Sequence, residues 1–274
     1  VYSRNADFQM LTALRDNRTR RLREGVIWVE GVRNLNIAID RGWTVRSLLY
    51  SSDAPLSQWA QERLQKTPTQ VNYQLAAPLL AELSDRDEGS ELLALVEMRD
   101  FAPALLPPKP APLLALMDRP ANRGNLGTII RSCDALGVDA LVLTGHGVDL
   151  YDPETVVASM GSFFALPIAR LESAAELDGW IDALRAQYRD FQAIGTSARG
   201  DSALDAIDLT RPTLLIIGNE TNGLSHRLAE LCDQMATIPM AETGAASSLN
   251  VACAATVLFY EAQRQRKSPA VSDL

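Results

Sequence analysis

Three segments in the second half of the chain place amide, glycine and charged residues directly after apolar runs. The first is NRGNLGTIIRSCDALG, residues 122–137, in which Asn122 lies in a turn of small residues and Arg131 follows about one turn into a predicted helix. Open α/β sheets bind ligands beyond the carboxyl ends of their strands, so Arg131 is expected to project over a ligand site. The alternatives are a plain strand-to-helix turn with a surface arginine, or a nucleotide phosphate loop, for which GxGxxG is absent.

The second segment, IIGNETNGLS at 216–225, runs from a predicted buried strand into a loop with two glycines, Gly218 and Gly223. Glycines let the backbone approach a ligand closely and leave N–H groups free to bind it, and Asn219 adds an amide. Glu220 could orient Arg131 or accept a hydrogen bond from a ligand hydroxyl. The simpler interpretation is an acid at a helix N-terminus, favoured by the helix dipole.

The third segment, IPMAETGAASSLNVACAATVLFYE at 238–261, predicts a strand, a loop of small residues and a long helix. Ser247 or Ser248 is the expected N-cap, and Asn250 falls in the first turn, where an amide needs a partner. The helix is apolar on almost every face, which indicates burial against both its own domain and a second subunit. We therefore expect a homodimer.

An alternation of strands and helices must position these segments. Strand-like runs after residue 112 predict a parallel sheet covered by helices, and lie at Leu113–Met117, Ala140–Thr144, Phe191–Gly195, Thr213–Ile217 and Ala236–Pro239. Runs at Val26–Val29, Val45–Tyr50 and Leu92–Met98, with helical patterns at Val32–Asp40 and Pro55–Gln65, predict a smaller α/β domain before it.

A proline-rich stretch, FAPALLPPKPAP at 101–112, cannot continue a helix or a central strand and predicts a linker. The expected division is therefore a first domain at 1–100, the linker at 101–112, a second domain at 113–267 and a tail at 268–274. Asp152-Pro153-Glu154 predicts a helix start, with the helix running toward Met160, and Gly137 and Gly161 are expected to end helices in the left-handed conformation.

The net charge of −8 is unevenly distributed: residues 1–111 hold 14 basic and 14 acidic groups, whereas 112–274 hold 12 and 20. The neutral half carries a run of arginines against Asp16 that suits the phosphates of a nucleic acid, or else forms a solvated helix face. The arginines of this run are Arg15, Arg18, Arg20, Arg21 and Arg23.

Composition excludes several other classes. The longest apolar run, Val251–Tyr260, is too short to span a bilayer, and no signal peptide is visible, so we expect a soluble cytoplasmic protein without a membrane partner. Cys133, Cys232 and Cys253 lie far apart in apolar helical patterns, which predicts three buried side chains, no disulfide and no metal site.

Together the three segments resemble the signature motifs of the TrmH-like, or SpoU, branch of the SPOUT methyltransferases, across about residues 112–266 and including VVASMGSFF at 156–164. The stretch SRNADFQMLTALRDNRTRRLREGVIWVEGVRNLNIAIDRG at 3–42 resembles, less specifically, the substrate-binding domain built like a small ribosomal protein that many members carry. The resemblance implies a trefoil-knotted parallel sheet, S-adenosyl-L-methionine as cofactor, and methyl transfer to a ribose 2′-hydroxyl of rRNA or tRNA.

The resemblance also assigns residues. It implies catalytic roles for Asn122, Arg131, Glu220, Ser248 and Asn250. It implies cofactor contacts for Thr196, Gly218, Asn219, Gly223, Ile238, Met240, Ser248 and Leu249. Two positions depart from the family pattern: Ala252 stands where serine is usual, and Val157 stands where arginine is frequent.

Arginine keeps its proton in proteins, so Arg131 is expected to act as an electrostatic clamp on the developing alkoxide and an adjacent phosphate rather than as a base. Two other functions stay open. Methylation of a base nitrogen would favour an acidic general base in place of these residues. A catalytically silent RNA-binding or ribosome-associated module would have no need for the intact set.

Overall fold

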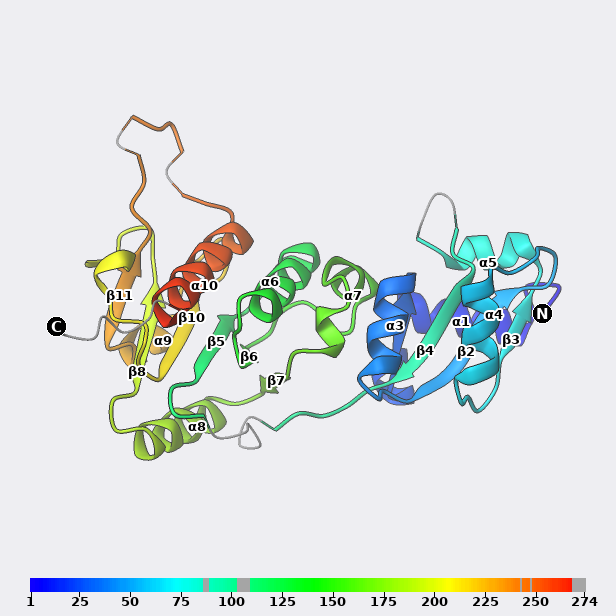
Figure 1. Ribbon diagram of the computed structural model, residues 1–274, viewed down its shortest axis with the longest axis horizontal. Coiled ribbons are helices and arrows are strands. Elements are labelled where there is room, and N and C mark those ends of the chain that lie inside the picture. Colours follow the sequence, from blue (N-terminus) through cyan, green and yellow to red (C-terminus); the bar gives the residue numbers. More distant parts are fainter. Residues whose placement is uncertain (86–88, 103–108, 242, 247, 268–274) are drawn as a thin grey trace. The chain divides into compact units, whose positions relative to one another are not determined.

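Two compact units make up the protein, in a computed structural model that describes residues 1–85, 89–102, 109–241, 243–246 and 248–267 (Figure 1). The first unit contains Val1–Arg99 and Asp149–Ala165, and the second contains Asp100–Val148 and Leu166–Leu274. The expected tail at 268–274, part of the linker at 103–108, and Ser247 lie outside the described residues. Each unit has its own sheet and is described by itself.

The first unit is built on a mixed four-stranded sheet in the order β1-β4-β2-β3, in which β2 and β3 are parallel and the other pairs antiparallel. Its strands are β1 (Val26–Glu30), β2 (Val45–Ser51), β3 (Tyr73–Leu75) and β4 (Leu92–Glu97). Its helices are α1 (Ala6–Asp16), α2 (Arg18–Glu24), α3 (Val32–Asp40), α4 (Gln58–Lys66), α5 (Ala77–Leu83) and α7 (Pro153–Ala158), with the 3-10 turn η2 (Ser162–Phe164). The sequence had predicted three of the four strands and missed β3.

Apolar side chains of α1, α5 and the sheet form the core of this unit, among them Phe8, Leu11, Trp28 and Leu93. Asn17 separates α1 from α2: its side chain accepts a hydrogen bond from the N–H of Arg20 at 3.0 Å and so caps α2. This cap fixes the arginine-rich helix directly before β1.

The segment Asp149–Ala165 belongs to the first unit although it lies far along the chain. As expected, Asp152 caps α7 by accepting from the N–H of Glu154 at 3.1 Å, and Gly161 is left-handed with φ 95°. The helix ends at Ala158, before Met160. The indole N–H of Trp43 donates to the carbonyl of Phe164 at 2.9 Å, which holds the segment against the loop after α3.

The second unit is a seven-stranded sheet whose neighbouring strands are all parallel, in the order β7-β6-β5-β10-β8-β11-β9. The strands are β5 (Leu113–Asp118), β6 (Ala140–Thr144), β7 (Ile168–Leu171), β8 (Gln192–Thr196), β9 (Ser202–Ala203), β10 (Thr213–Ile217) and β11 (Gln234–Thr237). The expected parallel α/β sheet is confirmed, and the trefoil knot stays a prediction. The short strands β7 and β9 were not predicted.

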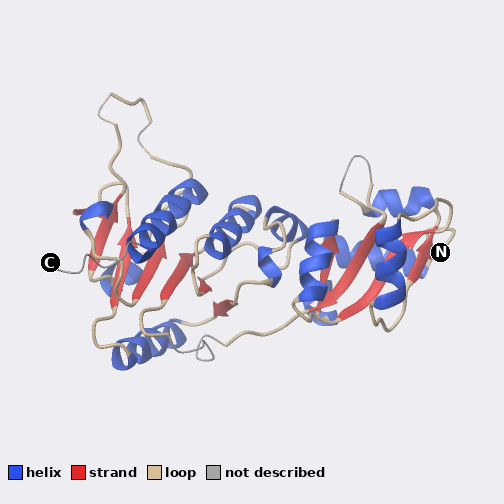
Figure 2. Cartoon of the chain, viewed as in Figure 1, coloured by secondary structure: helices blue, strands red, loops and turns tan. Residues whose placement is uncertain are grey.

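Helices cover both faces of this sheet (Figure 2). They are α6 (Arg123–Ala135), α8 (Ala174–Gln187), α9 (His226–Leu231) and α10 (Val251–Lys267), with the 3-10 turn η3 (Leu204–Ala206). Alternate side chains of the central strands, such as Leu114 and Ile216, pack with Trp180 of α8 and Leu228 of α9, because side chains along a strand point to opposite faces. Helices α6 and α10 lie together over the other face (Figure 1).

A half-buried arginine near the end of α10 holds this helix in place. Arg266 donates to the carbonyls of Ala111, Leu209 and Arg211 at 2.6, 2.8 and 2.7 Å. Burial lowers the pKa of Arg266, and its nearby backbone acceptors offset part of the cost of removing the cation from water. With its carboxyl end fixed, α10 presents its first residues at the opposite edge of the sheet.

The cysteines are less uniform than predicted. Cys133 is buried, and burial raises the pKa of its thiol; Cys232 is half-buried, and burial raises its pKa to about 11. Cys253 is exposed, so the prediction of burial is wrong for this chain by itself. Among the described residues, no His, Cys, Asp and Glu side chains gather in a group that could hold a metal ion. Within the same residues, no helix has the length and apolar character needed to cross a bilayer.

Candidate active site

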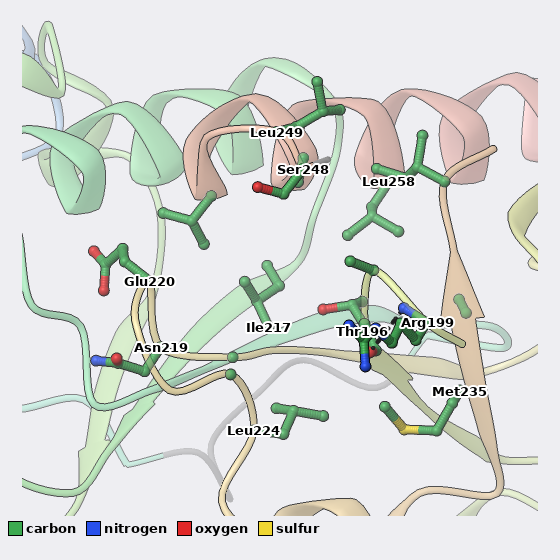
Figure 3. A pocket seen from close by; sticks show the side chains of 18 of the residues that line it. Thr196, Arg199, Ile217, Asn219, Glu220, Leu224, Met235, Ser248, Leu249 and Leu258 are labelled. Carbon is green, nitrogen blue, oxygen red and sulfur yellow. Dashed lines mark hydrogen bonds between the residues drawn. The ribbon is translucent and has the colours of Figure 1, made fainter. Parts of the chain in front are cut away.

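A cavity of about 820 Å³ lies at the carboxyl ends of β8, β10 and β11 and against the start of α10 (Figure 3). The topology explains this: parallel strands end at one edge of the sheet, so loops distant in sequence meet there. All the residues that the family resemblance assigns to the cofactor line this cavity: Thr196, Gly218, Asn219, Gly223, Ile238, Met240, Ser248 and Leu249.

The walls of the cavity are largely apolar. In Figure 3, Leu249 and Leu258 lie on the α10 side, and Ile217, Leu224 and Met235 lie around the strand ends. Leu249 is 39% exposed, although a leucine of a well-packed domain is usually buried. Apolar surface left open inside a cavity is suited to a flat, uncharged ring.

The loop after β10 has a tight, internally bonded shape. The backbones of Asn219 and Gly223 exchange two hydrogen bonds of 3.0 Å, and the Asn219 side chain accepts from the N–H groups of Thr221 and Asn222 at 2.9 and 3.0 Å. Gly223 has φ 66°, and a Cβ on Gly218 would meet the carbonyl carbon of Gly223 at 2.5 Å. Both glycines are therefore required by the shape of the loop itself.

This loop is also bonded to the loop that follows β5. Asp118 is buried and accepts from the N–H of Ser225 at 2.8 Å while it pairs with Arg119 at 2.9 Å. The hydrogen bond from Arg119 to Asp118 raises the pKa of Arg119. Asn219 donates its amide N–H to the carbonyl of Arg119 at 2.7 Å. The two loops thus form one rigid edge beside the cavity.

Glu220 has a positioning role in this edge. Its carboxylate accepts from the backbone N–H groups of Ala121 and Asn122 at 3.0 and 3.2 Å, and so binds the residues that lead into α6. The described residues include no hydrogen bond or ion pair between Glu220 and Arg131. The suggestion that Glu220 orients Arg131 therefore finds no contact to support it in the single chain.

Asn122 caps a helix. Its side chain accepts from the N–H of Asn125 at 2.8 Å, and the N–H groups at a helix start otherwise lack partners. Asn125, one turn further, contacts another predicted site residue: the amide N–H of Asn250 donates to the Asn125 side-chain oxygen at 3.2 Å. The structure thus brings Asn125, rather than the side chain of Asn122, to Asn250.

The start of α10 differs from the prediction. The helix begins at Val251, and Asn250 is its cap, because the Asn250 side-chain oxygen accepts from the N–H groups of Ala252 and Cys253 at 2.8 and 3.4 Å. The expectation of a Ser248 cap is wrong. Ser248 lies before the helix, in the cavity wall, where an exposed hydroxyl is free to meet a ligand.

Arg131 lies deeper in its helix than expected. Since α6 begins at Arg123, Arg131 is more than two turns in, about 12 Å along the axis, rather than one turn. Its side chain is exposed and does not line the cavity. The neighbouring Ser132 contacts Thr256 of α10 at 2.7 Å, so Arg131 lies beside the surface where α6 and α10 meet.

In the first unit, the arginine run is paired with several acids, of which Asp16 alone was evident as a neighbour from the sequence. Arg15 pairs with Asp16 at 2.6 Å, Arg20 and Arg23 approach Glu24 at 3.5 and 3.4 Å, and Arg18 approaches Asp149 at 3.9 Å. Arg18 and Arg23 remain 51% and 63% exposed and can still meet a phosphate.

Arg21 has no surface for a phosphate. It is 1% exposed, pairs with Asp149 at 2.7 Å, and donates to the carbonyls of Leu14 at 3.2 Å and Arg15. Its prediction as an RNA contact is corrected here: Arg21 is a buried structural cation that joins α2 to the segment Asp149–Ala165.

Three residues with clear structural roles were missed from the sequence. Asn125 lies in the same first segment as Asn122, and only the helix boundary shows which amide is the cap. Asp118 ends a strand, where a carboxylate before a polar turn is a usable signal. Arg199 lines the cavity from the loop after β8, a position with no motif of its own.

Comparison with known proteins identifies the family. The model of the SpoU rRNA Methylase family matches residues 112–260, and that of the SpoU L30e-like domain matches residues 5–94. The chain belongs to the SpoU rRNA methylase family, as its three segments had suggested.

Several relatives are similar along their whole length. A 23S rRNA (uridine(2479)-2′-O)-methyltransferase of Streptomyces viridochromogenes is 46% identical, over 98% of this chain and 93% of that protein. The crystal structure of the SpoU methyltransferase AviRb from the same organism, in complex with AdoMet, has a TM-score of 0.90 and covers 97% of this chain and 99% of its own. An AdoMet-bound rRNA methyltransferase from Sinorhizobium meliloti, 30% identical, has a TM-score of 0.83 and covers 96% and 97%.

Proposed function

We propose that this protein transfers the methyl group of S-adenosyl-L-methionine to a ribose 2′-hydroxyl of ribosomal RNA. The observation that carries the proposal is the convergence, at one cavity, of every residue that the resemblance assigns to the cofactor. Ribosomal RNA is favoured over transfer RNA because the relative at 46% identity, which matches nearly end to end, is named for 23S rRNA. A ribosomal substrate in turn favours the cytoplasm.

The cavity fits this cofactor in size and chemistry. Its volume of about 820 Å³ falls within the roughly 300–1,000 Å³ of small-molecule sites. The apolar side chains of Ile238, Met240 and Leu249 suit the adenine ring, and the tight loop at Gly218 offers backbone groups to the ribose. The cofactor supplies an electrophilic methyl group on a positively charged sulfur, next to which the carboxylate of Glu220 is favourable.

The acceptor side of the site is assigned to the adjoining helix ends. Asn125 and Asn250 are bonded to each other at the junction of α6 and α10, next to the cavity residues Ser248 and Leu249. Their amides can orient a ribose. Arg131 is proposed to hold the developing alkoxide and a phosphate, since a guanidinium retains its proton and stabilises negative charge.

Arg131 does not line the cavity of its own chain, and this favours a homodimer in which a second subunit lies near Arg131. On α10, Cys253, Val257 and Tyr260 form an exposed stripe, with Val257 37% and Tyr260 56% exposed. Residues four and three positions apart lie on one helix face, so the stripe can pack against its copy across a two-fold axis. Such packing would place Arg131, beside the α6–α10 junction, close to the second subunit.

The test is methyl transfer by the full chain to 23S rRNA with labelled cofactor, followed by digestion and mass spectrometry of the nucleosides. A ribose-methylated nucleoside, with uridine favoured by the named relative, is expected. A base-methylated nucleoside would instead support the nitrogen methyltransferase. Cofactor binding without transfer to rRNA or tRNA would support the silent RNA-binding module.

A further inference from the structure

Arg199 is the cationic residue of the cavity. Among the described residues that line it, Arg199 and Glu220 have ionisable side chains and the others are apolar or neutral. In Figure 3 these two residues lie on opposite sides of the cavity, with Glu220 at the loop after β10 and Arg199 at the loop after β8. The cavity therefore has an acidic side and a basic side.

The loop that carries Arg199 is fixed in place. The N–H of Arg199 donates to the Ser197 hydroxyl at 3.1 Å, and the N–H of Ser197 donates to the carbonyl of Ala236 in β11 at 3.0 Å. A Cβ on Gly200 would meet the carbonyl oxygen of Met235 at 2.5 Å, which shows that the loop is pressed against β11. The backbone under Arg199 is thus held at the cavity before any ligand binds.

No acidic side chain of the described residues pairs with Arg199, in contrast to Arg119 and Arg185 of the same unit, which pair with Asp118 and Asp233. The Arg199 side chain is exposed. A cation at a cavity wall without a protein partner offers its hydrogen bonds to an anionic ligand group.

We propose that Arg199 binds the carboxylate of the cofactor's amino-acid tail, an inference that rests on the proposed function and adds a recognition residue to it. The cofactor carries one anionic group, this carboxylate, and two cationic groups, the ammonium and the sulfonium. Attraction of the carboxylate to Arg199 and of the sulfonium toward Glu220 selects one direction of binding, with the methyl group toward the proposed acceptor side. The neutral adenosine part makes no use of Arg199.

The competing role for Arg199 is a contact to an RNA phosphate. The two roles predict different results for cofactor binding measured without RNA. If Arg199 contacts an RNA phosphate, its replacement leaves that binding unchanged. They can be separated without RNA by two ligands: S-adenosylhomocysteine, which has the amino-acid tail, and 5′-methylthioadenosine, which keeps the adenosine but has no carboxylate.

Calorimetry on the full chain would compare both ligands for the native protein and for Arg199→Gln, Arg199→Lys and Arg189→Gln. Arg189 is exposed in the same unit and does not line the cavity, so its variant controls for the charge change. Arg199→Gln is expected to weaken S-adenosylhomocysteine about tenfold, as for loss of a charged hydrogen bond, and to leave methylthioadenosine within about twofold. Arg199→Lys should recover part of the loss, and Arg189→Gln should change neither ligand.

Each other result overturns the proposal in a recognisable way. Unchanged binding of both ligands to Arg199→Gln removes Arg199 from cofactor recognition and favours the RNA phosphate. An equal loss for both ligands assigns Arg199 to the shape of the cavity or to the adenosine. If the native chain, folded by circular dichroism, bound neither ligand, the proposed function would fail and this inference with it.

Discussion

The arginine run of the first unit and the cavity of the second differ in how closeness in sequence relates to closeness in the structure. Arg15 to Arg23 are close in sequence, yet the fold pairs them with Asp16, Glu24 and Asp149 and buries one of them. Thr196, Gly218 and Leu249 are far apart in sequence, yet they line one cavity.

The difference follows from secondary structure. On a short helix such as α2, side chains point in all directions, so a run of like charges spreads over several faces. In a parallel sheet, strand ends meet at one edge, so small, polar residues after strands converge whatever their separation. Position after a strand is thus a better guide to a site than local density of charge.

The largest effect is expected from Arg21→Met. The change leaves Asp149, 7% exposed, without its 2.7 Å partner, and breaking a buried ion pair costs about 3–5 kcal/mol. Urea unfolding should show this loss in the free energy of unfolding. The matched change Arg23→Met, at a 63% exposed side chain, should stay within about 0.5 kcal/mol. Equal stability of the two variants would return Arg21 to the candidate RNA contacts.

Next in size is the loss of methyl transfer in Arg131→Lys. Lysine keeps the charge but lacks the planar fork that can hold an oxygen and a phosphate together, so transfer should fall about 10²–10³-fold. Stability and cofactor affinity should remain near native, because Arg131 is exposed and outside the cavity. Single-turnover transfer, with cofactor binding measured in parallel, tests this. Near-native turnover of the lysine variant would mean that positive charge alone suffices.

Most of the fold was predictable because its signals are local. Ala140–Thr144 and Thr213–Ile217 are buried in every residue, and such continuous apolar runs gave both strands with their bounds. β9 has two residues, and β7 alternates between buried and half-buried positions, so neither gives a strong run. The segment Asp149–Ala165 groups with the first unit through contacts between residues far apart in sequence. One of them is the pairing of Asp149 with Arg21 across 128 positions, which no local pattern shows.

The sequence predicted which residues belong to the site better than it predicted what each of them does. Family resemblance named many of the residues that line the cavity, although not Arg199. It did not show which amide caps a helix, because that depends on where the helix begins. Because α6 begins at Arg123, Asn122 is its cap and Asn125 lies inside the helix. Because α10 begins at Val251, its cap is Asn250 rather than Ser248. Helix ends are the least certain part of any assignment from sequence.

Two caps provide a smaller, sharper test of these roles. Asn122→Ala and Asn250→Ala each remove a helix cap and should each cost about 1 kcal/mol of stability. Asn122→Ala removes a hydrogen bond from the backbone N–H of Asn125, whereas Asn250→Ala removes the contact to the Asn125 side chain. The loss of methyl transfer should therefore be larger for Asn250→Ala than for Asn122→Ala at equal fractions folded. Urea unfolding and initial rates of transfer measure the two effects. If both variants lost transfer equally, the side chain of Asn122 would regain its place in the active site.

The smallest effect concerns the arginines that remain exposed. Arg18→Gln with Arg23→Gln should lower the slope of log affinity for RNA against log salt concentration by roughly 1–2, since each lost phosphate contact removes about 0.7–0.9. The matched pair Arg33→Gln with Arg41→Gln lies in the same unit, also exposed, but outside the run, and removes equal charge. Binding measured by fluorescence anisotropy at several salt concentrations gives both slopes. If RNA phosphates bind the arginine run specifically, the change at Arg18 and Arg23 will lower the slope more than the change at Arg33 and Arg41. Equal slopes would assign Arg18 and Arg23 to solvated surface, and RNA affinity would then have to come from other parts of the chain.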